Sequence, residues 1–388
     1  MPPRARAPPQ VRRGAHGGPA GDPRLDVDVI VLCVNSGSSS VKLALYREEE
    51  RLASSSVARV TDHGQAVHEG LAELEGQGFP SPDAAGHRFV HGGPRHHAPR
   101  RLDAELLASL REAVPFAPLH LPAALLGVEA VSARRPGIPQ VACFDTDFHW
   151  SMPQVARRLP LPRELDEAGV RRYGFHGLSY ESVVAEIGAA RLGRAVLAHL
   201  GNGASMAAVR DGRSVDTTMG LTPAGGFMMG TRTGDLDPGV LIHLLDAHGY
   251  DSRRLEELID RRSGLLAISE RTSDMRELLA ARSTDPRAEL ALEMFCYQAA
   301  KAAGALATAL GGIDSLVFTG GIGEHAPPVR DGICARLAAL GVRLDPALNA
   351  ASAAIISADD SSCTVRVVPA DEERSISRHT ARVLAKQI

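Results

Sequence analysis

The segment from Asp216 to Pro238 gathers residue types that bind anions. It is rich in glycine and threonine and contains a single base, Arg232. Glycine lets backbone amides approach a ligand, threonine supplies hydroxyls, and a guanidinium can form two parallel hydrogen bonds with one carboxylate or phosphoryl group. Few of these side chains could fill a core. We therefore predict that the segment lines a site for phosphate or carboxylate oxygens.

Two short polar loops repeat one pattern. Residues 35–40, Asn-Ser-Gly-Ser-Ser-Ser, separate two apolar runs of strand length, and residues 199–205 do the same half a chain later. Each reads as a hairpin, so the pair predicts an internal duplication. Lys42 follows the first loop and could neutralise phosphate oxygens. Alone, either loop is equally consistent with an ordinary polar turn; together they could hold one phosphate chain from both sides.

A third glycine-rich stretch, residues 318–325, follows another apolar strand. Glycines after a strand are a common setting for nucleotide phosphates. The stretch does not match Gly-x-Gly-x-x-Gly, and no acid is placed to bind a ribose. A dinucleotide-dependent dehydrogenase is therefore disfavoured.

Other candidates for chemistry stand at the ends of predicted strands. Arg88 lies on a short strand that ends in Gly-Gly, and Asp145 ends an apolar strand. His176 lies between glycines, although a lone histidine is more often structural. His91, His96 and His97 lack a carboxylate or cysteine at a useful helical spacing, so a histidine metal centre is not favoured.

The elements that must position these residues are strands mixed with helices, which predicts α/β domains with mixed sheets. A Pro-rich stretch at 153–162 is a plausible domain junction, and the 388 residues suffice for two domains. Helical periodicity is found at residues 102–113, 119–133, 181–189, 239–247, 255–261 and 287–310.

Composition excludes several classes of function. A net charge of −3 gives no reason to expect nucleic acid or an anionic membrane as the main partner, and no apolar run approaches a membrane span. Five scattered cysteines argue against a disulfide framework and for a reducing cytoplasm. Residues 1–28, rich in Pro, Gly and Arg, are predicted to form a disordered extension.

These motifs together resemble the acetate kinase (acetokinase) family, within the actin-like ATPase and sugar kinase superfamily. The resemblance follows the family's order and covers essentially all of residues 29–388. It is carried by stretches 35–42, 87–93, 117–120, 144–149, 173–177, 199–205, 216–238, 273–276, 318–324 and 371–373.

The resemblance implies reversible transfer of a phosphoryl group from ATP to acetate, giving ADP and acetyl phosphate, in the cytoplasm. It implies two duplicated actin-like (ribonuclease H-like) domains with a nucleotide cleft between them, and a homodimer. We expect one domain to comprise residues 29–150 with a returning C-terminal helix at 374–388, and the other residues 151–373. A divalent cation, Mg²⁺ with Mn²⁺ as an alternative, would accompany ATP or ADP.

The resemblance also implies roles for individual residues. Asn35 and Glu372 would bind the metal. Arg88, Asp145, His176 and Arg232 would act on the transferred group, Arg88 also on the carboxylate. The acetate methyl would contact Val90, Leu119, Phe175 and Pro223. The nucleotide would contact Ser38, Ser40, Lys42, His199, Leu200, Gly201, Asn202, Gly203, Asp274, Met275, Arg276, Gly321, Ile322, Gly323, Glu324 and His325.

Two alternatives stay open. A small apolar pocket distinguishes acids that differ by one methylene by only about 1–3 kcal/mol, so propionate or butyrate could be the natural substrate. A non-catalytic ATP-binding protein is the other alternative, because His325 and the loop at 268–273 depart from the family's pattern. The retained set of arginines, acids and histidine favours an enzyme.

Overall fold

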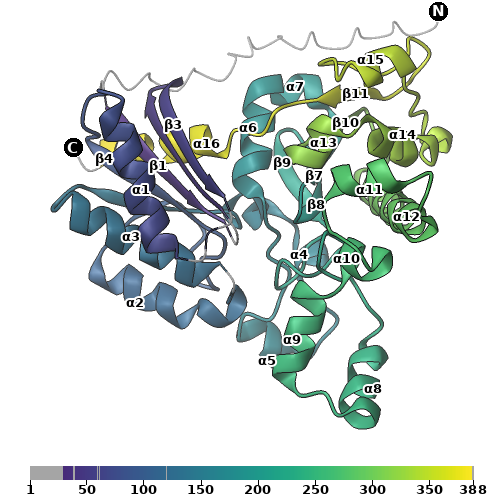
Figure 1. Cartoon of the computed structure of the whole chain (residues 1–388), viewed down its shortest axis with the longest axis horizontal. Coiled ribbons are helices and arrows are strands. Elements are labelled where there is room, and N and C mark those ends of the chain that lie inside the picture. Colours follow the sequence, from purple (N-terminus) through teal and green to yellow (C-terminus); the bar gives the residue numbers. More distant parts are fainter. Residues whose placement is uncertain (1–28, 38–39, 59, 61, 119, 387–388) are drawn as a thin grey trace, which may run out of the picture.

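The computed structural model describes residues 29–37, 40–58, 60, 62–118 and 120–386, which form two mixed β-sheets with helices between and around them (Figure 1). The predicted disordered extension at 1–28, and the candidates Ser38 and Leu119, lie outside these residues. No helix in the described part is both long and apolar enough to cross a membrane.

The first sheet has the strand order β3-β2-β1-β4-β6-β5. Strands β1 to β3 form an antiparallel meander, whereas β4 and β6 run parallel to β1. All seven residues of β1 are buried, as expected of an apolar run in the middle of a covered sheet. The strands are β1 (Ile30–Ser36), β2 (Ser40–Arg47), β3 (Glu50–Ala58), β4 (Ala84–Phe89), β5 (Arg100–Arg101) and β6 (Gln140–Phe144).

The second sheet repeats this topology, with order β11-β10-β7-β8-β9. Strands β7 to β9 form the antiparallel meander, and β10 and β11 run parallel to β7. The predicted duplication is thus confirmed at the level of strand order. The strands are β7 (Arg194–Leu200), β8 (Ala204–Arg210), β9 (Arg213–Thr217), β10 (Ser315–Thr319) and β11 (Thr364–Val367).

Two helices lie between the sheets and contact each other. Helix α16 covers one face of the first sheet, where its Ile376 packs with Val31 and Cys33, and helix α6 covers one face of the second. The fit is close at β4: a Cβ on Gly86 would lie 2.2 Å from Thr380 of α16. The outer faces are covered by α1 and α3 on the first sheet and by α12 on the second.

Helices occur at all six positions that periodicity predicts, with ends shifted by a few residues. The α-helices are α1 (His63–Gly76), α2 (Ala104–Glu112), α3 (Leu121–Arg134), α4 (Gln154–Arg157), α5 (Arg163–Glu167), α6 (Gly177–Ile187), α7 (Ala189–Leu192), α8 (Pro238–His248), α9 (Ser252–Arg261), α10 (Gly264–Ser269), α11 (Met275–Ala281), α12 (Pro286–Leu310), α13 (Gly320–His325), α14 (Pro327–Ala335), α15 (Pro346–Ala350) and α16 (Glu372–Ala385). Short 3-10 helices are η1 (Val114–Phe116), η2 (Asp147–Ser151) and η3 (Ala338–Leu340).

The observed helix ends can be compared with the two predicted domain limits, at residues 150/151 and 373/374. The returning helix α16 begins at Glu372, two residues before the expected 374, because the Asp371 carboxylate caps its first turn. The expected limit at 150/151 falls inside η2, whose His149 reaches Ser214 on β9 at 2.9 Å. The division into two domains stays a prediction.

Candidate active site

The polar residues of the first sheet continue its buried face. Because side chains alternate along a strand, Asn35 lies on the same face as Val31 and Cys33, and Asp145 on the same face as Cys143. This face is covered by α16, and the helix begins where the polar residues appear. The carboxyl ends of parallel strands therefore meet the acidic first turn of α16.

Arg88, near the end of β4, is held by a buried carboxylate. Its Nε lies 3.1 and 3.0 Å from the two oxygens of Asp145, its Nη2 lies 2.6 Å from Oδ2, and its Nη1 donates to Asn35 Oδ1 at 3.1 Å. The Asp145 side chain has no exposed surface. Burial raises the pKa of Asp145 to about 6, although Arg88 acts in the opposite direction.

Two glutamates complete this cluster. The Asn35 amide donates to Glu372 at 2.9 Å and to Glu373 at 2.8 Å, and Glu372 lies 3.6 Å from Arg88. Burial by itself would raise the pKa of Glu372, but Arg88, His199 and the Asn35 amide together hold it below its usual value. Three acids thus surround one guanidinium, and the cluster carries excess negative charge whenever they are ionised.

Two histidines stack at the facing end of the second sheet. The rings of His176 and His199 are 4.2 Å apart and nearly parallel, and their Nδ1 atoms bond Ser205 and Ser179, both at 2.8 Å. Burial lowers the pKa of His199 to about 4 and that of His176 well below its usual value, so both are neutral at pH 7. His176 has φ of 59°, a left-handed conformation that costs a non-glycine residue about 1–3 kcal/mol.

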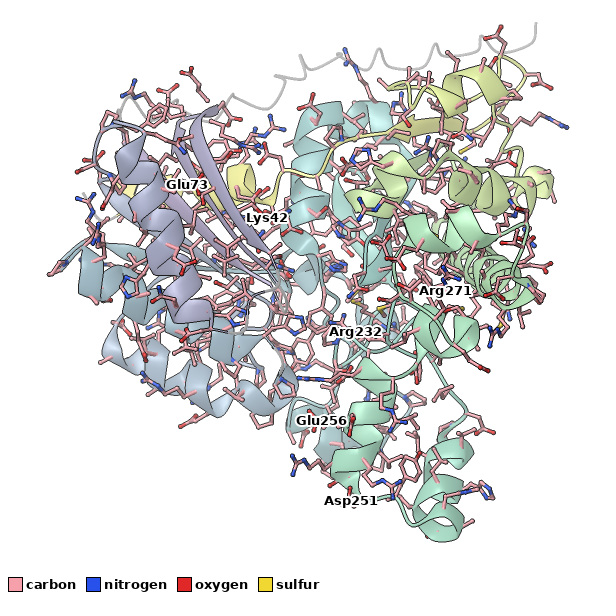
Figure 2. All side chains as sticks on the ribbon, in the orientation of Figure 1. Lys42, Glu73, Arg232, Asp251, Glu256 and Arg271 are labelled. Atoms are coloured by element: carbon pink, nitrogen blue, oxygen red, sulfur yellow. The ribbon has the colours of Figure 1, made fainter. Side chains whose placement is uncertain are left out.

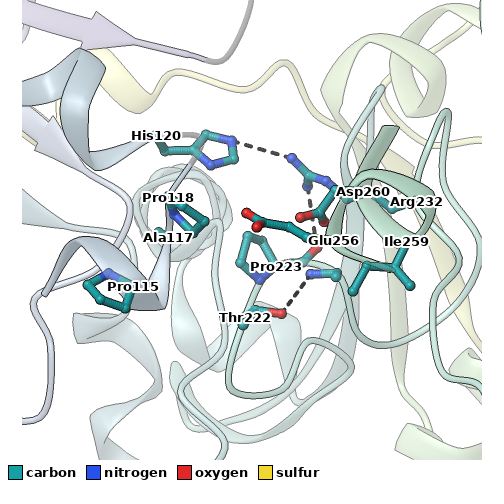
Figure 3. Close-up of a pocket in the computed structure, with 11 residues that line it drawn as sticks. Pro115, Ala117, Pro118, His120, Thr222, Pro223, Arg232, Glu256, Ile259 and Asp260 are labelled. Atoms are coloured by element: carbon teal, nitrogen blue, oxygen red, sulfur yellow. Dashed lines mark hydrogen bonds between the residues drawn. The ribbon is translucent and has the colours of Figure 1, made fainter. Parts of the chain in front are cut away.

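Arg232, from the anion-binding segment of the sequence, lies over the loop between β7 and β8. Its Nη1 would be 3.1 Å from a Cβ on Gly203, and His176 Nε2 would be 3.7 Å from the same point, so any larger residue here would crowd both side chains. Arg232 contacts His120 Nε2 at 3.3 Å and the Pro223 carbonyl at 3.3 Å, both neutral groups (Figure 3). In Figure 2, Lys42 lies on the N-terminal half and Arg232 on the C-terminal half.

A cavity of about 150 Å³ adjoins Arg232 (Figure 3). Its walls come from Pro115, Ala117, Pro118 and His120 of the N-terminal half, from Thr222–Ala224, and from Glu256, Ile259 and Asp260 of α9. The lining is largely apolar apart from the guanidinium, the two acids, Thr222 and His120. A small anion with an apolar tail is the kind of ligand that such walls accommodate.

Comparison with known proteins identifies the lineage. The acetokinase family profile matches residues 48–378, which is most of the chain. The chain belongs to the acetokinase family. An acetate kinase of Rhodopseudomonas palustris is 44% identical over 91% of this chain and 98% of its own.

Solved structures agree. The acetate kinase of Porphyromonas gingivalis is 38% identical, with a TM-score of 0.82 over 92% of this chain and all of its own. A propionate kinase from Francisella tularensis is 33% identical, with a TM-score of 0.83 over the same shares. The expected family and fold class are confirmed.

Lys42 is exposed but lies beside the central cluster: it pairs with Asn35 across the β1–β2 hairpin, and its charge helps to lower the pKa of Glu372. Other predicted residues lie apart from the cluster. Asp274 caps α11 and pairs with Arg276, which is 90% exposed. Val90 and Phe175 are buried in the large core cluster, and only Pro223 of the expected methyl contacts lines the cavity within the described residues.

The loop and glycine segments expected to bind nucleotide meet at the end of the second sheet. The Asn202 carbonyl accepts from Gly230 at 3.0 Å, which joins the β7–β8 loop to the segment of Arg232. Residues 320–325, expected to bind nucleotide, form helix α13 directly after β10, with His325 exposed. A Cβ on Gly320 would lie 2.8 Å from the Leu200 carbonyl oxygen. Only glycine therefore allows the first residue of the helix to lie this close to Leu200.

Sequence reasoning missed three residues of the site. The motifs of the sequence assign no role to His120, Ser205 or Glu373. Ser205 could have been found from the pairing expected in a hairpin, since it faces His199 across the loop. His120 and Arg232 are 112 residues apart, and nothing local in the sequence connects them.

Proposed function

We propose that this protein catalyses reversible, direct transfer of the ATP γ-phosphoryl group to acetate, giving ADP and acetyl phosphate. The observation that carries the proposal is the meeting of Arg232 and His176 above Gly203, beside the apolar cavity. Acetate is already ionised at neutral pH, so it needs no general base. It needs alignment with the phosphoryl group and relief of repulsion between two anions.

The two arginines divide this work. Arg88 is committed to Asp145, so its charge chiefly balances the acids of the cluster. Arg232 has neutral hydrogen-bond partners; burial lowers its pKa, and the nearby Asp260 carboxylate acts in the opposite direction. We therefore assign to Arg232 the main contact with the anion in transfer. Neutral His176 would donate a hydrogen bond from Nε2 to the developing charge, its Nδ1 accepting from Ser205.

The acidic cluster fits a divalent cation. Asn35, Glu372 and the neighbouring carboxylates offer oxygen atoms, and one guanidinium does not balance their charge. Within the described residues no group of three or more His, Cys, Asp or Glu could hold a metal alone. Mg²⁺ is usually bound through one or two carboxylates plus phosphates and water, so Asn35 and Glu372 suffice. When bound, Mg²⁺ would neutralise charge on the nucleotide phosphates.

The nucleotide would lie between the two loops of the duplicated hairpins. In this proposal Lys42 and Ser40 face the phosphates from β2, and the loop of residues 199–203 faces them from the second sheet. The N-terminal turn of α13, with Gly321 to Glu324, and the Asp274–Arg276 segment would contact the rest of ATP. All five cysteines are free and buried, which supports a cytoplasmic location.

The test is hydroxamate trapping of the acyl phosphate with ATP, Mg²⁺ and acetate. The wild-type protein should form acyl hydroxamate, and Arg232→Ala should lose at least a hundredfold in kcat/KM. Arg163→Ala, whose side chain is 81% exposed, is the matched control and should match wild type. No acyl phosphate from folded wild-type protein would favour the non-catalytic alternative, and an active Arg232→Ala would remove the proposed role.

A second candidate substrate is propionate or butyrate. The cavity of about 150 Å³ is several times the roughly 30 Å³ that a water-sized group such as methyl occupies. Residues beyond Pro223 could contact a longer chain. Measuring kcat/KM for acetate, propionate and butyrate decides between them: a value for propionate above that for acetate would overturn acetate as the preferred acid.

We further propose a homodimer through helix α8. The helix has no buried residue, and Leu236, Val240, Ile242 and Leu245 expose 42–58% of their surface on or beside it. Figure 1 shows α8 projecting from the body. Ile242→Glu should convert the dimer to monomer in light scattering, whereas Leu348→Glu on α15 should not. A wild-type monomer would refute this assembly.

A further inference from the structure

A hydrogen-bonded group outside the described site links the β2–β3 hairpin to the start of α16. The Tyr46 hydroxyl donates to Asp371 at 2.7 Å and accepts from Arg51 Nε at 2.7 Å. Arg51 Nη2 also lies 2.9 Å from the same oxygen of Asp371. Two residues of one hairpin and a third, 325 positions after Tyr46, therefore form one closed triangle.

Asp371 connects the Tyr46–Arg51 pair to helix α16, because it is also the N-cap of that helix. Its Oδ1 also accepts from the backbone N–H of Arg374 at 3.0 Å, which makes it the N-cap of α16. Glu372 and Glu373 are the next two residues, and both accept from Asn35. The atom that Tyr46 and Arg51 hold is thus the atom that fixes the first turn of the helix bearing Glu372.

Burial fixes the position of the Tyr46 side chain. Tyr46 is 1% exposed and lies on the face of the sheet that packs against α16, among Ala44, Cys33 and Ile376. Its ring is held by this packing, so its hydroxyl has little freedom to leave Asp371. A phenylalanine would keep the packing and remove only the link.

The positive charge of Arg51 also offsets repulsion among the acids at the start of α16. Asp371, Glu372 and Glu373 are consecutive acids, and like charges at one helix start repel each other. Arg51 pairs with Asp371 from the outside, which leaves Arg88 to balance Glu372 from within the cluster. Without Arg51, the ion-pair partner left to Asp371 among the described residues is Arg374, whose Nε is 3.8 Å away.

We propose that Tyr46 and Arg51 are positioning residues that hold Glu372, through Asp371, in the geometry that binds the cation of the bound nucleotide. The inference rests on the proposed function for the identity of that ligand. Groups that hydrogen-bond a metal ligand typically change metal affinity 10- to 100-fold when removed; Tyr46 and Arg51 act one residue further back, through Asp371, so we expect an effect at the lower end of that range. The expected effect is therefore on cation affinity more than on acetate.

The test measures Mn²⁺ binding to the full chain with saturating ADP, from the electron paramagnetic resonance signal of free Mn²⁺. Tyr46→Phe should weaken binding about tenfold, raise the Mg²⁺ concentration for half-maximal turnover similarly, and leave the KM for acetate unchanged. Glu49→Gln is the matched control: it breaks the Glu49–Arg378 pair, which joins the same two elements farther along α16. It should bind Mn²⁺ as wild type does.

Arg51→Lys provides a second variant on a half-exposed side chain in case Tyr46→Phe folds poorly. Lysine keeps the charge but has one nitrogen where Arg51 uses Nε and Nη2, so it cannot reproduce both contacts in this geometry, and Mn²⁺ affinity should fall between those of wild type and Tyr46→Phe. Unchanged Mn²⁺ affinity in both variants, with only a lower melting temperature, would overturn the proposal. Because the binding measurement contains no acetate, it stands even if wild-type protein makes no acyl phosphate; absence of Mn²⁺–ADP binding by wild type would overturn it.

Discussion

Replacing Arg88 by alanine should destabilise the protein in a manner that depends on pH. The guanidinium gives Asp145 its hydrogen bonds at 2.6–3.1 Å, and the carboxylate has no exposed surface. Removing one partner of such a buried pair leaves an uncompensated charge and costs about 3–5 kcal/mol. We expect a loss of this size for Arg88→Ala at pH 8.

The direction in which stability changes with pH follows from whether the folded or the unfolded state binds more protons. Burial raises the pKa of Asp145 above its unfolded value of 3.8, so the folded state binds the extra proton and stability falls as pH rises from about 4 through the folded pKa. Without Arg88 that folded pKa rises further. The destabilisation by Arg88→Ala should therefore be smaller at pH 5, where Asp145 is protonated, than at pH 8.

Denaturant unfolding followed by the fluorescence of Trp150, the single tryptophan, measures this. Asp145→Asn in the Arg88→Ala background removes the stranded charge and should recover about 2 kcal/mol or more at pH 8. Arg95→Ala breaks an exposed pair with Glu112 and should change stability by no more than about 0.5 kcal/mol. If Arg88→Ala loses no more than Arg95→Ala, or loses as much at pH 5 as at pH 8, the argument from a buried charge is wrong.

Three further predictions test separate parts of the site. His176→Gly should lower kcat at least a hundredfold while the melting temperature stays within a few degrees, because relief of the left-handed backbone offsets the lost bond to Ser205; retained activity would contradict it. Melting temperature should fall as pH is lowered from 7 to 5, because His87, His91, His149 and His199, with folded pKa of about 4, bind protons mainly when unfolded and together outweigh the opposite contribution of Asp145; a flat profile would contradict this. Ile259→Phe should narrow the cavity and reduce kcat/KM for butyrate relative to acetate about tenfold, as judged by the ratio of the two values.

Local patterns in the sequence were sufficient for the hairpins and the ends of the central strands. Alternation and apolar runs located β1, β2, β7, β8 and β10, and the repeat of strand, polar loop and strand indicated the duplication. Arg88 and Asp145 were predicted from their place at strand ends, and the structure brings them into contact. These features depend on residues close in the chain, where the physical rule is the period of a strand.

Other features depend on contacts that only the folded chain makes. His120 meets Arg232 across 112 residues, and Asn35 meets Glu373 across 338. The start of α16 is set by a cap and by Tyr46 on a distant strand, not by the helical pattern itself. Residues 320–325 form a helix although glycine is a poor helix former, and the close approach of Gly320 to the Leu200 carbonyl exists only in the folded chain.

The sequence by itself therefore determined the family, the duplicated strand pattern and which residue types could handle two anions. The tertiary structure decided which arginine is committed to a carboxylate and which has neutral partners, and it created the cavity beside Arg232. The physical reason is that charge balance and burial are properties of surroundings. Surroundings at Arg88 and Arg232 are built from both halves of the chain, so no stretch of sequence contains them.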